Sequence, residues 1–212
     1  LCYCGPVLHT RPGGPFASRE PLQLGAELYG HAGLEADLEI LELALQGLRQ
    51  SGLTDAVIDL GDARIVSTVL EGQDLSEEHR QAVLDALAAK DTQALKGLTH
   101  HLDVAVAGAL EFLVSAYGDD QVLNAAHKAL AAWPLALSAL DDLTWLTRQL
   151  NQPVMYDLAD ARGYAYYSGI RFAIYVSQLH EAVIRGGRYD EVGAVFGRRR
   201  AAVGFSLDLK SL

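Results

Sequence analysis

The sequence predicts an α+β fold in which an antiparallel sheet flanked by helices is interrupted by an all-helical insertion. Strand and helix signals mix over residues 1–65 and return over residues 151–212. Between these segments, residues 66–150 are rich in Ala, Leu, Lys and Gln, which favour helices. Strand-containing segments on both sides of a helical stretch indicate one sheet-containing core in two parts, with the helical segment inserted between them.

The first part of the core is expected to hold strands on both sides of a helix. An apolar run ends at Leu8, and residues 22–29 alternate apolar side chains with Gln23, Gly25 and Glu27, which therefore share one face of a strand. The other expected elements are an amphipathic helix with its apolar face formed by Leu38, Leu41, Leu45 and Leu48, and a strand over residues 56–60. Because the chain begins inside a strand, we expect the N-terminal part of this fold and its first motif to be missing.

The remainder of the chain is expected to form about four helices and then further strands. Ser76 followed by two glutamates is typical of a helix start, since the hydroxyl caps backbone N–H groups and the acids complement the helix dipole. Strands are expected over residues 163–167, 170–176 and 201–205. Residues 185–190 have the glycine content and charge of a turn.

Composition excludes several classes of protein. With 50% apolar and 21% charged residues, the 212-residue chain can bury a substantial core, which excludes a disordered protein. No apolar run approaches the roughly 20 residues of a transmembrane helix, so no membrane partner is expected. The net charge of −10 has the wrong sign for a nucleic-acid backbone, so no nucleic-acid partner is expected either. Cys2 and Cys4 are too close in sequence to join easily, which favours a reducing, cytoplasmic location.

Sequence motifs for common catalytic and metal sites are absent. The chain has no phosphate-binding loop, no nucleophile elbow and no His-Glu-x-x-His zinc motif. His100 and His101 are adjacent on an expected helix, so their side chains diverge and chelate poorly. We therefore expect no catalytic residue, no metal site and no cofactor.

Tyrosine, arginine and glycine cluster in two segments, residues 162–169 and residues 186–190. Tyrosine rings offer stacking surface and hydroxyl groups, while Arg162 can neutralise a carboxylate, so the two segments could line a small polar pocket. An ordinary tyrosine-rich strand with a tight turn is the alternative interpretation.

Five short motifs, in this order, resemble the catalytic domain of histidyl-tRNA synthetase, a class II aminoacyl-tRNA synthetase. They occupy residues 3–8, 23–30, 162–169, 186–190 and 202–207, and they run over nearly the whole chain. The resemblance implies a class II synthetase-like antiparallel sheet with a helical insertion at the same place. The synthetases also have an anticodon-binding domain, and we expect this chain to have none.

The resemblance implies that a binding site for histidine is retained. Gln23 and Glu27 match synthetase positions that hold the amino group, and Arg162 matches the arginine that faces the substrate carboxylate. Tyr167 and Tyr189 match tyrosines near the imidazole ring. The other members of the expected histidine-binding set are Tyr166, Gly186 and Gly187.

The ATP side of the synthetase site, in contrast, is not retained. His9 stands where the synthetases have an arginine that holds the α-phosphate, and Ser211 replaces the arginine that grips the γ-phosphate. Asp208 brings a carboxylate where a small residue lines the adenine pocket, and the loop over residues 11–18 is mostly uncharged. A triphosphate needs fixed cations, so these lost ATP-site positions predict that the chain does not adenylate histidine.

A synthetase-like fold with a histidine site but no ATP site resembles the regulatory subunits of ATP phosphoribosyltransferase. That family implies a cytoplasmic hetero-oligomer with the short catalytic subunit in the first step of histidine biosynthesis. It implies that this non-catalytic chain activates its partner, mediates feedback inhibition by the effector histidine, and self-associates through the synthetase-like core. Two alternatives stay open, a catalytic-domain fragment of a histidine–tRNA ligase and a scaffold that binds no ligand.

One basic run, Arg198-Arg199-Arg200, departs from the otherwise acidic composition. It is either a solvated turn or a docking patch for the transferase.

Overall fold

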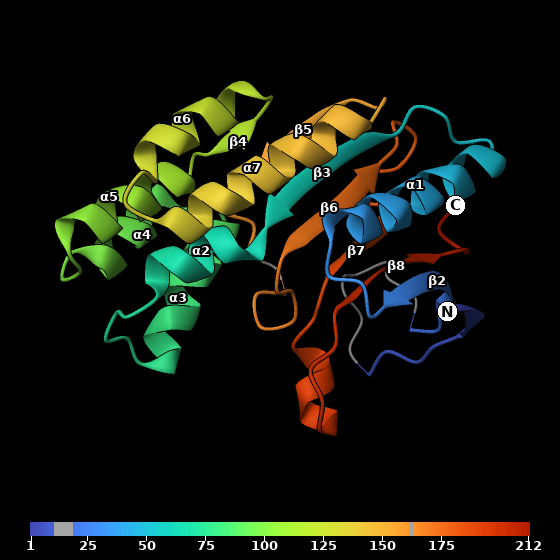
Figure 1. The fold of residues 1–212 in the computed structure, drawn as a ribbon, viewed down its shortest axis with the longest axis horizontal. Coiled ribbons are helices and arrows are strands. Elements are labelled where there is room, and N and C mark those ends of the chain that lie inside the picture. Colours follow the sequence, from blue (N-terminus) through green and yellow to red (C-terminus); the bar gives the residue numbers. More distant parts are fainter. Residues whose placement is uncertain (11–18, 162) are drawn as a thin grey trace. The chain divides into compact units, whose positions relative to one another are not determined.

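The computed structural model describes residues 1–10, 19–161 and 163–212 of the chain (Figure 1). The chain divides into two units, one formed by Leu1–Ile58 with Phe172–Leu212 and the other by Asp59–Arg171. Among the described residues, no helix is both long enough and apolar enough to cross a membrane. The predicted division of the chain at residues 65 and 150 stays a prediction.

The first unit is built on an antiparallel arrangement of strands. Its strands lie in the order β1 (Cys2–Pro6), β2 (Leu22–Tyr29), β8 (Ala202–Asp208), β7 (Ile184–Arg188) and β6 (Ile170–Tyr175). The pairs β1–β2, β2–β8 and β7–β8 are antiparallel, and Glu27 of β2 lies opposite Gly204 of β8. The strand predicted over residues 22–29 is thereby confirmed.

Helix α1 (Leu34–Gln50) covers one face of these strands. Its leucines repeat at helical spacing, and Leu41 and Leu48 are completely buried. Burial of each such leucine contributes about 1.5–3 kcal/mol. The predicted amphipathic helix is therefore confirmed, and it leaves the opposite face of the strands free of α1.

A buried ion pair fixes α1 to β7. Arg188 donates hydrogen bonds from Nε to both carboxylate oxygens of Asp37 at 3.2 Å, and a further bond runs from its Nη2 to the same carboxylate. It also donates to the backbone oxygens of His31 and Gly33 at 3.3 and 3.2 Å. Asp37 and Arg188 are only 2% and 7% exposed, so the structure depends on their remaining paired.

The second unit contains a helical assembly and three strands. Strands β3 (Val57–Asp62), β5 (Val154–Asp157) and β4 (Tyr117–Gly118) lie in that order. The helices are α2 (Ala63–Leu70), α3 (Glu77–Ala88), α4 (Thr92–Thr99), α5 (Val104–Leu113), α6 (Gln121–Ala129) and α7 (Pro134–Gln149). The second unit thus holds six helices, more than the four or so expected over residues 66–150, because short turns divide the Ala- and Leu-rich stretch repeatedly.

Local side-chain contacts explain where several of these helices begin. The Ser76 hydroxyl accepts a hydrogen bond from the backbone N–H of His79 at 3.2 Å, as the sequence predicts for a helix cap. Asp62 caps α2 through the N–H of Arg64 at 2.9 Å, and the Arg64 guanidinium bridges Asp62 and Asp142 of α7 at 2.6 and 2.8 Å. Burial raises the pKa of Asp62, while its bonds to Arg64 oppose that shift.

Two segments differ from the secondary structure expected of them. The strand expected over residues 163–167 does not form, and residues 163–166 are turns. Gly163 has a positive φ of 74°, and its carbonyl accepts hydrogen bonds from the backbone N–H groups of Tyr166 and Tyr167 at 2.8 and 2.9 Å. A turn is expected over residues 185–190, but Ile184–Arg188 form strand β7 and pair with β8. The glycines of β7 permit close backbone packing in a strand, and they do not mark a turn.

Candidate functional site

On the face of the strands that points away from α1, three positions carry glycine instead of a side chain. We call Gly25, Gly187 and Gly204 the glycine floor. Gly187 of β7 lies opposite Gly204 of β8, which in turn lies opposite Glu27 of β2. A Cβ atom on Gly204 would overlap the Glu27 carboxylate, and a Cβ atom on Gly25 would overlap the Tyr3 hydroxyl. The missing side chains therefore make the room in which Glu27 and Tyr3 lie.

Alternation along the strands places this floor opposite the α1 face. Arg188 reaches Asp37 of α1, so its neighbours Gly187 and Tyr189 point to the other side. Likewise, Ala26 lines a groove against α1, and its neighbour Glu27 points away from that helix.

Glu27 is the centre of a network of hydrogen bonds on this face. The Tyr189 hydroxyl donates to its Oε2 at 2.5 Å, and the Tyr3 hydroxyl donates to its Oε1 at 3.2 Å. Tyr189 also lies 3.3 Å from the Tyr29 hydroxyl, and Gln23 donates from Nε2 to the Tyr3 hydroxyl at 3.3 Å. The network holds the carboxylate in one position over the glycine floor.

The network keeps Tyr189 and Tyr3 in their neutral, hydrogen-donating form. Burial, followed by the hydrogen bond to Glu27, raises the pKa of Tyr189 well above its ordinary value of 10. Burial and the neighbouring Glu27 charge raise the pKa of Tyr3 as well. Near neutral pH, both hydroxyls therefore keep their protons and donate them to the Glu27 side chain.

This arrangement suits a small cationic group. A carboxylate offers about four lone-pair positions, of which Tyr189 and Tyr3 use one each. The rings of Tyr29 and Tyr189 stand at 90° with their centres 6.5 Å apart beside it. An ammonium group can therefore bind Glu27 through charge-assisted hydrogen bonds and lie near aromatic rings.

The structure brings together part of the predicted histidine-binding set. Gln23, Glu27, Gly187 and Tyr189 share the glycine-floored face. Gly186 points to the opposite face, where a Cβ atom would meet the Phe172 ring and the Phe205 side chain.

The other predicted members belong to the second unit. Tyr166 and Tyr167 follow Gly163 in the turn, and their rings stand at 81° with centres 5.1 Å apart. Arg162 lies outside the described residues.

Asp208 and Ser211, two of the lost ATP-site positions, contact each other. The Ser211 hydroxyl donates to Asp208 Oδ2 at 2.9 Å, and the backbone N–H groups of Leu22 and Lys210 donate to Oδ1 at 2.9 and 3.0 Å. Partial burial acts to raise the pKa of Asp208, but these hydrogen bonds outweigh it and hold that pKa below its ordinary value. Asp208 therefore ties the end of β8 to the start of β2.

Of the remaining ATP-side positions, only His9 lies among the described residues. His9 is exposed and bonds through its backbone N–H to the Arg19 carbonyl at 2.8 Å. The loop over residues 11–18 lies outside the described part of the chain.

Sequence reasoning missed three contributors to the Glu27 network, namely Tyr3, Tyr29 and Gly204. Tyr29 could have been found, because it continues the same alternation as Gln23, Gly25 and Glu27. Tyr3 and Gly204 could not, because their positions depend on the register of β2 against β1 and β8.

Histidines and cysteines do not form a metal site in the described part of the chain, where no group of three or more His, Cys, Asp or Glu side chains has suitable geometry. The rings of His79 and His101 pack edge to face with centres 4.9 Å apart, and those of His100 and His101 lie 5.3 Å apart. Cys2 and Cys4 are free and exposed on β1.

One known protein family has a sequence model that matches the whole of this chain. The model described as histidyl-tRNA synthetase matches residues 1–212. The chain belongs to the histidyl-tRNA synthetase family.

Curated relatives of this histidyl-tRNA synthetase family member carry another description. Proteins named ATP phosphoribosyltransferase regulatory subunit from Albidiferax ferrireducens and Verminephrobacter eiseniae are each 55% identical to it over 213 residues, covering 100% of this chain and 56% of each relative. The protein of that name from Paraburkholderia xenovorans is 50% identical over 213 residues, with the same shares covered. The chain thus spans about 56% of the length of the curated relatives it matches.

Solved structures of the family share the fold. An ATP phosphoribosyltransferase regulatory subunit/histidyl-tRNA synthetase from Bacillus halodurans C matches with a TM-score of 0.82 and 25% identity, over 99% of this chain and 56% of that chain. The ATP phosphoribosyl transferase (HisG:HisZ) complex from Thermotoga maritima matches with a TM-score of 0.73 and 22% identity, over 99% of this chain and 72% of that chain. The predicted class II synthetase-like α+β fold is confirmed.

Proposed function

We propose that this chain is part of a regulatory subunit of ATP phosphoribosyltransferase, with no catalytic role of its own. In this proposal it activates the short catalytic subunit in the first step of histidine biosynthesis and mediates feedback inhibition by histidine. Identity of 55% over the full chain to proteins of that name supports the proposal. A cytoplasmic hetero-oligomer with the catalytic subunit, and self-association through the synthetase-like core, are parts of the same proposal.

The observation that carries the histidine part is the Glu27 carboxylate on its glycine floor. In the proposed complex, the ammonium group of histidine binds Glu27, and the imidazole ring lies against tyrosine rings, with Tyr189 among them. Two neutral tyrosine hydroxyls already orient Glu27, so little reorganisation is needed when the ligand arrives. That Arg162, Tyr166 and Tyr167 also contact the ligand stays a prediction that rests on the synthetase resemblance.

The ATP side supports a non-catalytic role. Ser211 cannot supply a positive charge, and its hydroxyl is engaged with Asp208. A negative carboxylate next to that position repels phosphate oxygens, which need cations to be held.

The test uses the full-length subunit with the short catalytic subunit. Transfer of the phosphoribosyl group to ATP is measured with and without the regulatory subunit, and then against histidine concentration. We expect the subunit to increase the rate and histidine to reverse the increase. A rate that is unaffected by the subunit would contradict the regulatory role.

A catalytic-domain fragment of a histidine–tRNA ligase is the second candidate, because the matching family model is that of the synthetase. Histidine-dependent exchange of pyrophosphate into ATP separates the two. We expect no exchange from the full-length protein, and measurable exchange would favour the ligase.

A further inference from the structure

The connection between β7 and β8 forms a projecting tip, which we call the η1 finger (residues 190–200). It contains the 3-10 helix η1 (Val192–Phe196), coloured orange-red at the lower end of Figure 1. Val195 and Phe196 are 84% and 86% exposed. Neither side chain is covered by another described residue. Two adjacent exposed apolar side chains of this size are typical of a surface that binds a partner.

The finger is held in shape by its own backbone. Hydrogen bonds run from the Arg198 N–H to the Gly193 carbonyl at 3.1 Å and from the Gly197 N–H to the Ala194 carbonyl at 3.0 Å. A Cβ atom on Gly193 would come within 2.5 Å of the Arg198 carbonyl oxygen, and Gly197 has a φ of 95°, so glycine is needed at both positions. A preformed tip loses little conformational entropy on binding.

The base of the finger is anchored to the strands. Asp190 Oδ1 accepts a hydrogen bond from the Ala202 N–H at 2.8 Å and lies 3.4 Å from Arg188 Nη1. The finger therefore projects from a fixed support.

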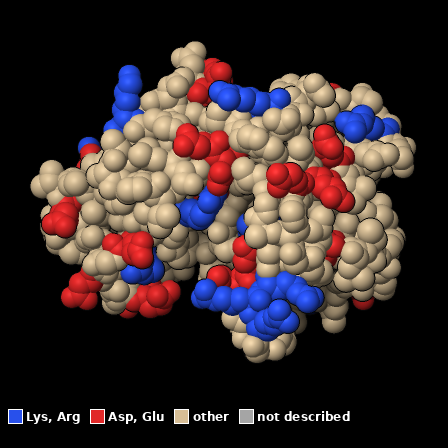
Figure 2. Space-filling view, viewed as in Figure 1, with Lys and Arg blue, Asp and Glu red and all other residues tan. Residues whose placement is uncertain are grey.

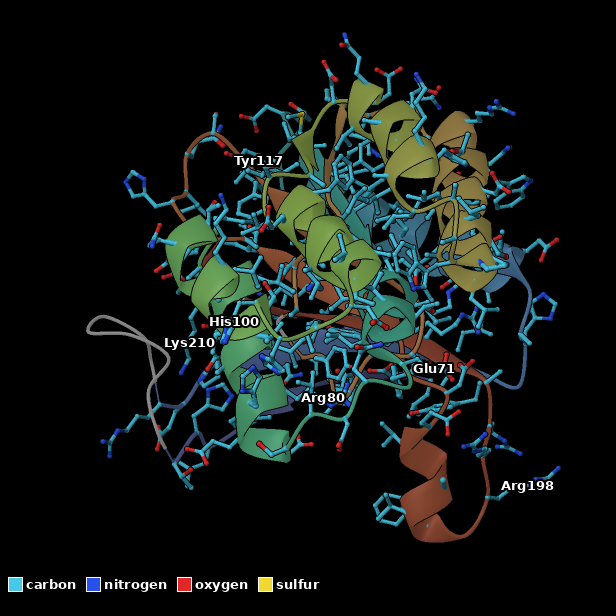
Figure 3. The ribbon with its side chains drawn as sticks, turned by 90° about the vertical axis from the view of Figure 1, so that its left-hand side faces the viewer. Glu71, Arg80, His100, Tyr117, Arg198 and Lys210 are labelled. Carbon is cyan, nitrogen blue, oxygen red and sulfur yellow. The ribbon has the colours of Figure 1, made fainter. Side chains whose placement is uncertain are left out.

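Three arginines follow the apolar tip. Arg198, Arg199 and Arg200 are all exposed, and Figure 3 shows Arg198 pointing away from the ribbon. Arg199 pairs with Glu191 at 2.7 Å, whereas Arg198 and Arg200 have no ion pair with any described residue. Figure 2 shows Lys and Arg gathered at this end, in a chain whose net charge is −10.

We propose that the η1 finger docks into an apolar pocket with an acidic rim on the catalytic subunit of the transferase. Phe196 and Val195 enter the pocket, and Arg198 and Arg200 contact carboxylates at its edge. Aromatic and arginine side chains are the residues that most often dominate binding energy at protein interfaces. The identity of the partner rests on the proposed function, while the chemistry of the surface rests on the finger alone.

Other occupants fit the finger less well. A nucleic acid would meet three arginines but no match for the apolar tip, and the acidic remainder of the chain would repel it. A two-fold contact centred on the finger of a second copy would set three arginines against three arginines. A different chain with carboxylates around an apolar pocket satisfies both the charge and the apolar side chains.

The test measures binding of the full-length subunit to the catalytic subunit by calorimetry, together with activation of the transferase. One variant carries Val195→Ser and Phe196→Ser, and its control carries Val104→Ser and Leu135→Ser at exposed positions of other helices. A second variant carries Arg198→Glu and Arg200→Glu, and its control carries Arg49→Glu and Arg148→Glu, which change the net charge equally. We expect each finger variant to weaken binding at least tenfold and the controls to bind as the wild type does.

Two further measurements distinguish the remaining outcomes, namely the salt dependence of binding and the behaviour of the regulatory subunit without its partner. Wild-type binding should weaken as NaCl rises from about 50 to about 500 mM, and binding of the Arg198→Glu, Arg200→Glu variant should depend much less on salt. Finger variants that bind and activate like the wild type would overturn the finger proposal but leave the proposed function standing. If the finger variants change the sedimentation mass of the subunit measured without its partner, the finger binds a second copy and the finger proposal is overturned. If the wild type binds an RNA oligonucleotide and the variants do not, the finger binds RNA and the proposal is likewise overturned. A wild-type subunit that neither binds nor activates the transferase would overturn the proposed function, and this inference with it.

Discussion

Replacing Glu27 by glutamine tests whether its charge is what the site offers to a ligand. Glutamine has nearly the same volume, so it still fits over Gly204, and its side-chain oxygen can still accept from the Tyr189 hydroxyl. The substitution therefore removes one charge and little packing. We expect the free energy of unfolding to change by roughly 1 kcal/mol or less.

The loss in ligand binding follows from the contact removed. A hydrogen bond between an ammonium group and a carboxylate contributes about 1.5–3 kcal/mol. Its loss corresponds to an increase of about tenfold to 150-fold in the dissociation constant of histidine. The assay is calorimetric titration of the full-length protein with histidine, before and after Glu27→Gln.

A ligand without the amino group makes the test specific. 3-(Imidazol-4-yl)propionate lacks the ammonium of histidine, so it should bind the wild type more weakly than histidine does and bind Glu27→Gln with nearly unchanged affinity. Glu39→Gln, on the exposed side of α1, is the matched control and should leave both affinities unchanged. If Glu27→Gln reduces the affinity for both ligands equally, the ammonium is not bound by Glu27 and the reasoning is refuted.

Three further predictions follow from other contacts. Asp37→Ala leaves the buried Arg188 guanidinium without its carboxylate partner and should lower the free energy of unfolding, measured in urea, by about 3–5 kcal/mol. The control Glu39→Ala, at an exposed position, should have little effect, and equal losses would contradict the importance of the ion pair. Because the pKa of Asp208 is lowered in the folded chain, its carboxylate stabilises the fold above the unfolded-state pKa of about 4, and this contribution is lost as pH falls through the folded-state pKa. The stability difference between wild type and Asp208→Asn in urea should therefore shrink on acidification, and a difference independent of pH would oppose that role. Tyr167→Ala should leave activation of the transferase intact while raising the histidine concentration needed for half inhibition, and an unchanged inhibition curve would exclude Tyr167 from the effector site.

Periodicity in the sequence was sufficient for the elements whose two faces have different surroundings. Residues 22–29 alternate because one face packs toward α1 and the other carries Gln23 and Glu27, and the structure has β2 over these residues. Helix α1 shows the same logic at helical spacing, with its leucines on the buried side. In both cases the apolar pattern records a difference in burial.

The pattern was misleading where glycine replaced side chains. The sequence predicts a turn at Gly186 and Gly187, but in β7 they lie opposite Phe205 and Gly204. At Gly186, the missing side chain makes room for the Phe172 ring and the Phe205 side chain. Sequence alone cannot distinguish a glycine that bends the chain from one that lets another side chain approach.

The candidate site was predicted in part for a similar reason. Glu27, Gln23 and Tyr189 carry groups with recognisable chemistry, and the structure places them on one face. Tyr3 depends on pairing between two separate strands, and pairing is a property of the register rather than of either sequence segment. The ion pair between Asp37 and Arg188, 151 positions apart, was invisible for the same reason.

Strand β7 joins the features on which both proposals depend. Arg188 holds α1 on one face, and the next residue, Tyr189, donates to Glu27 on the other. Asp190 follows directly, accepts from Ala202 and anchors the η1 finger. A ligand that changes the bond between Tyr189 and Glu27 therefore acts on the residue next to the finger's anchor. A ligand shifts a conformational equilibrium only by its difference in affinity for the two states. In the proposed complex, residues 188–190 are where such a difference can pass from the ligand to a partner docked on the finger, within one unit of the chain.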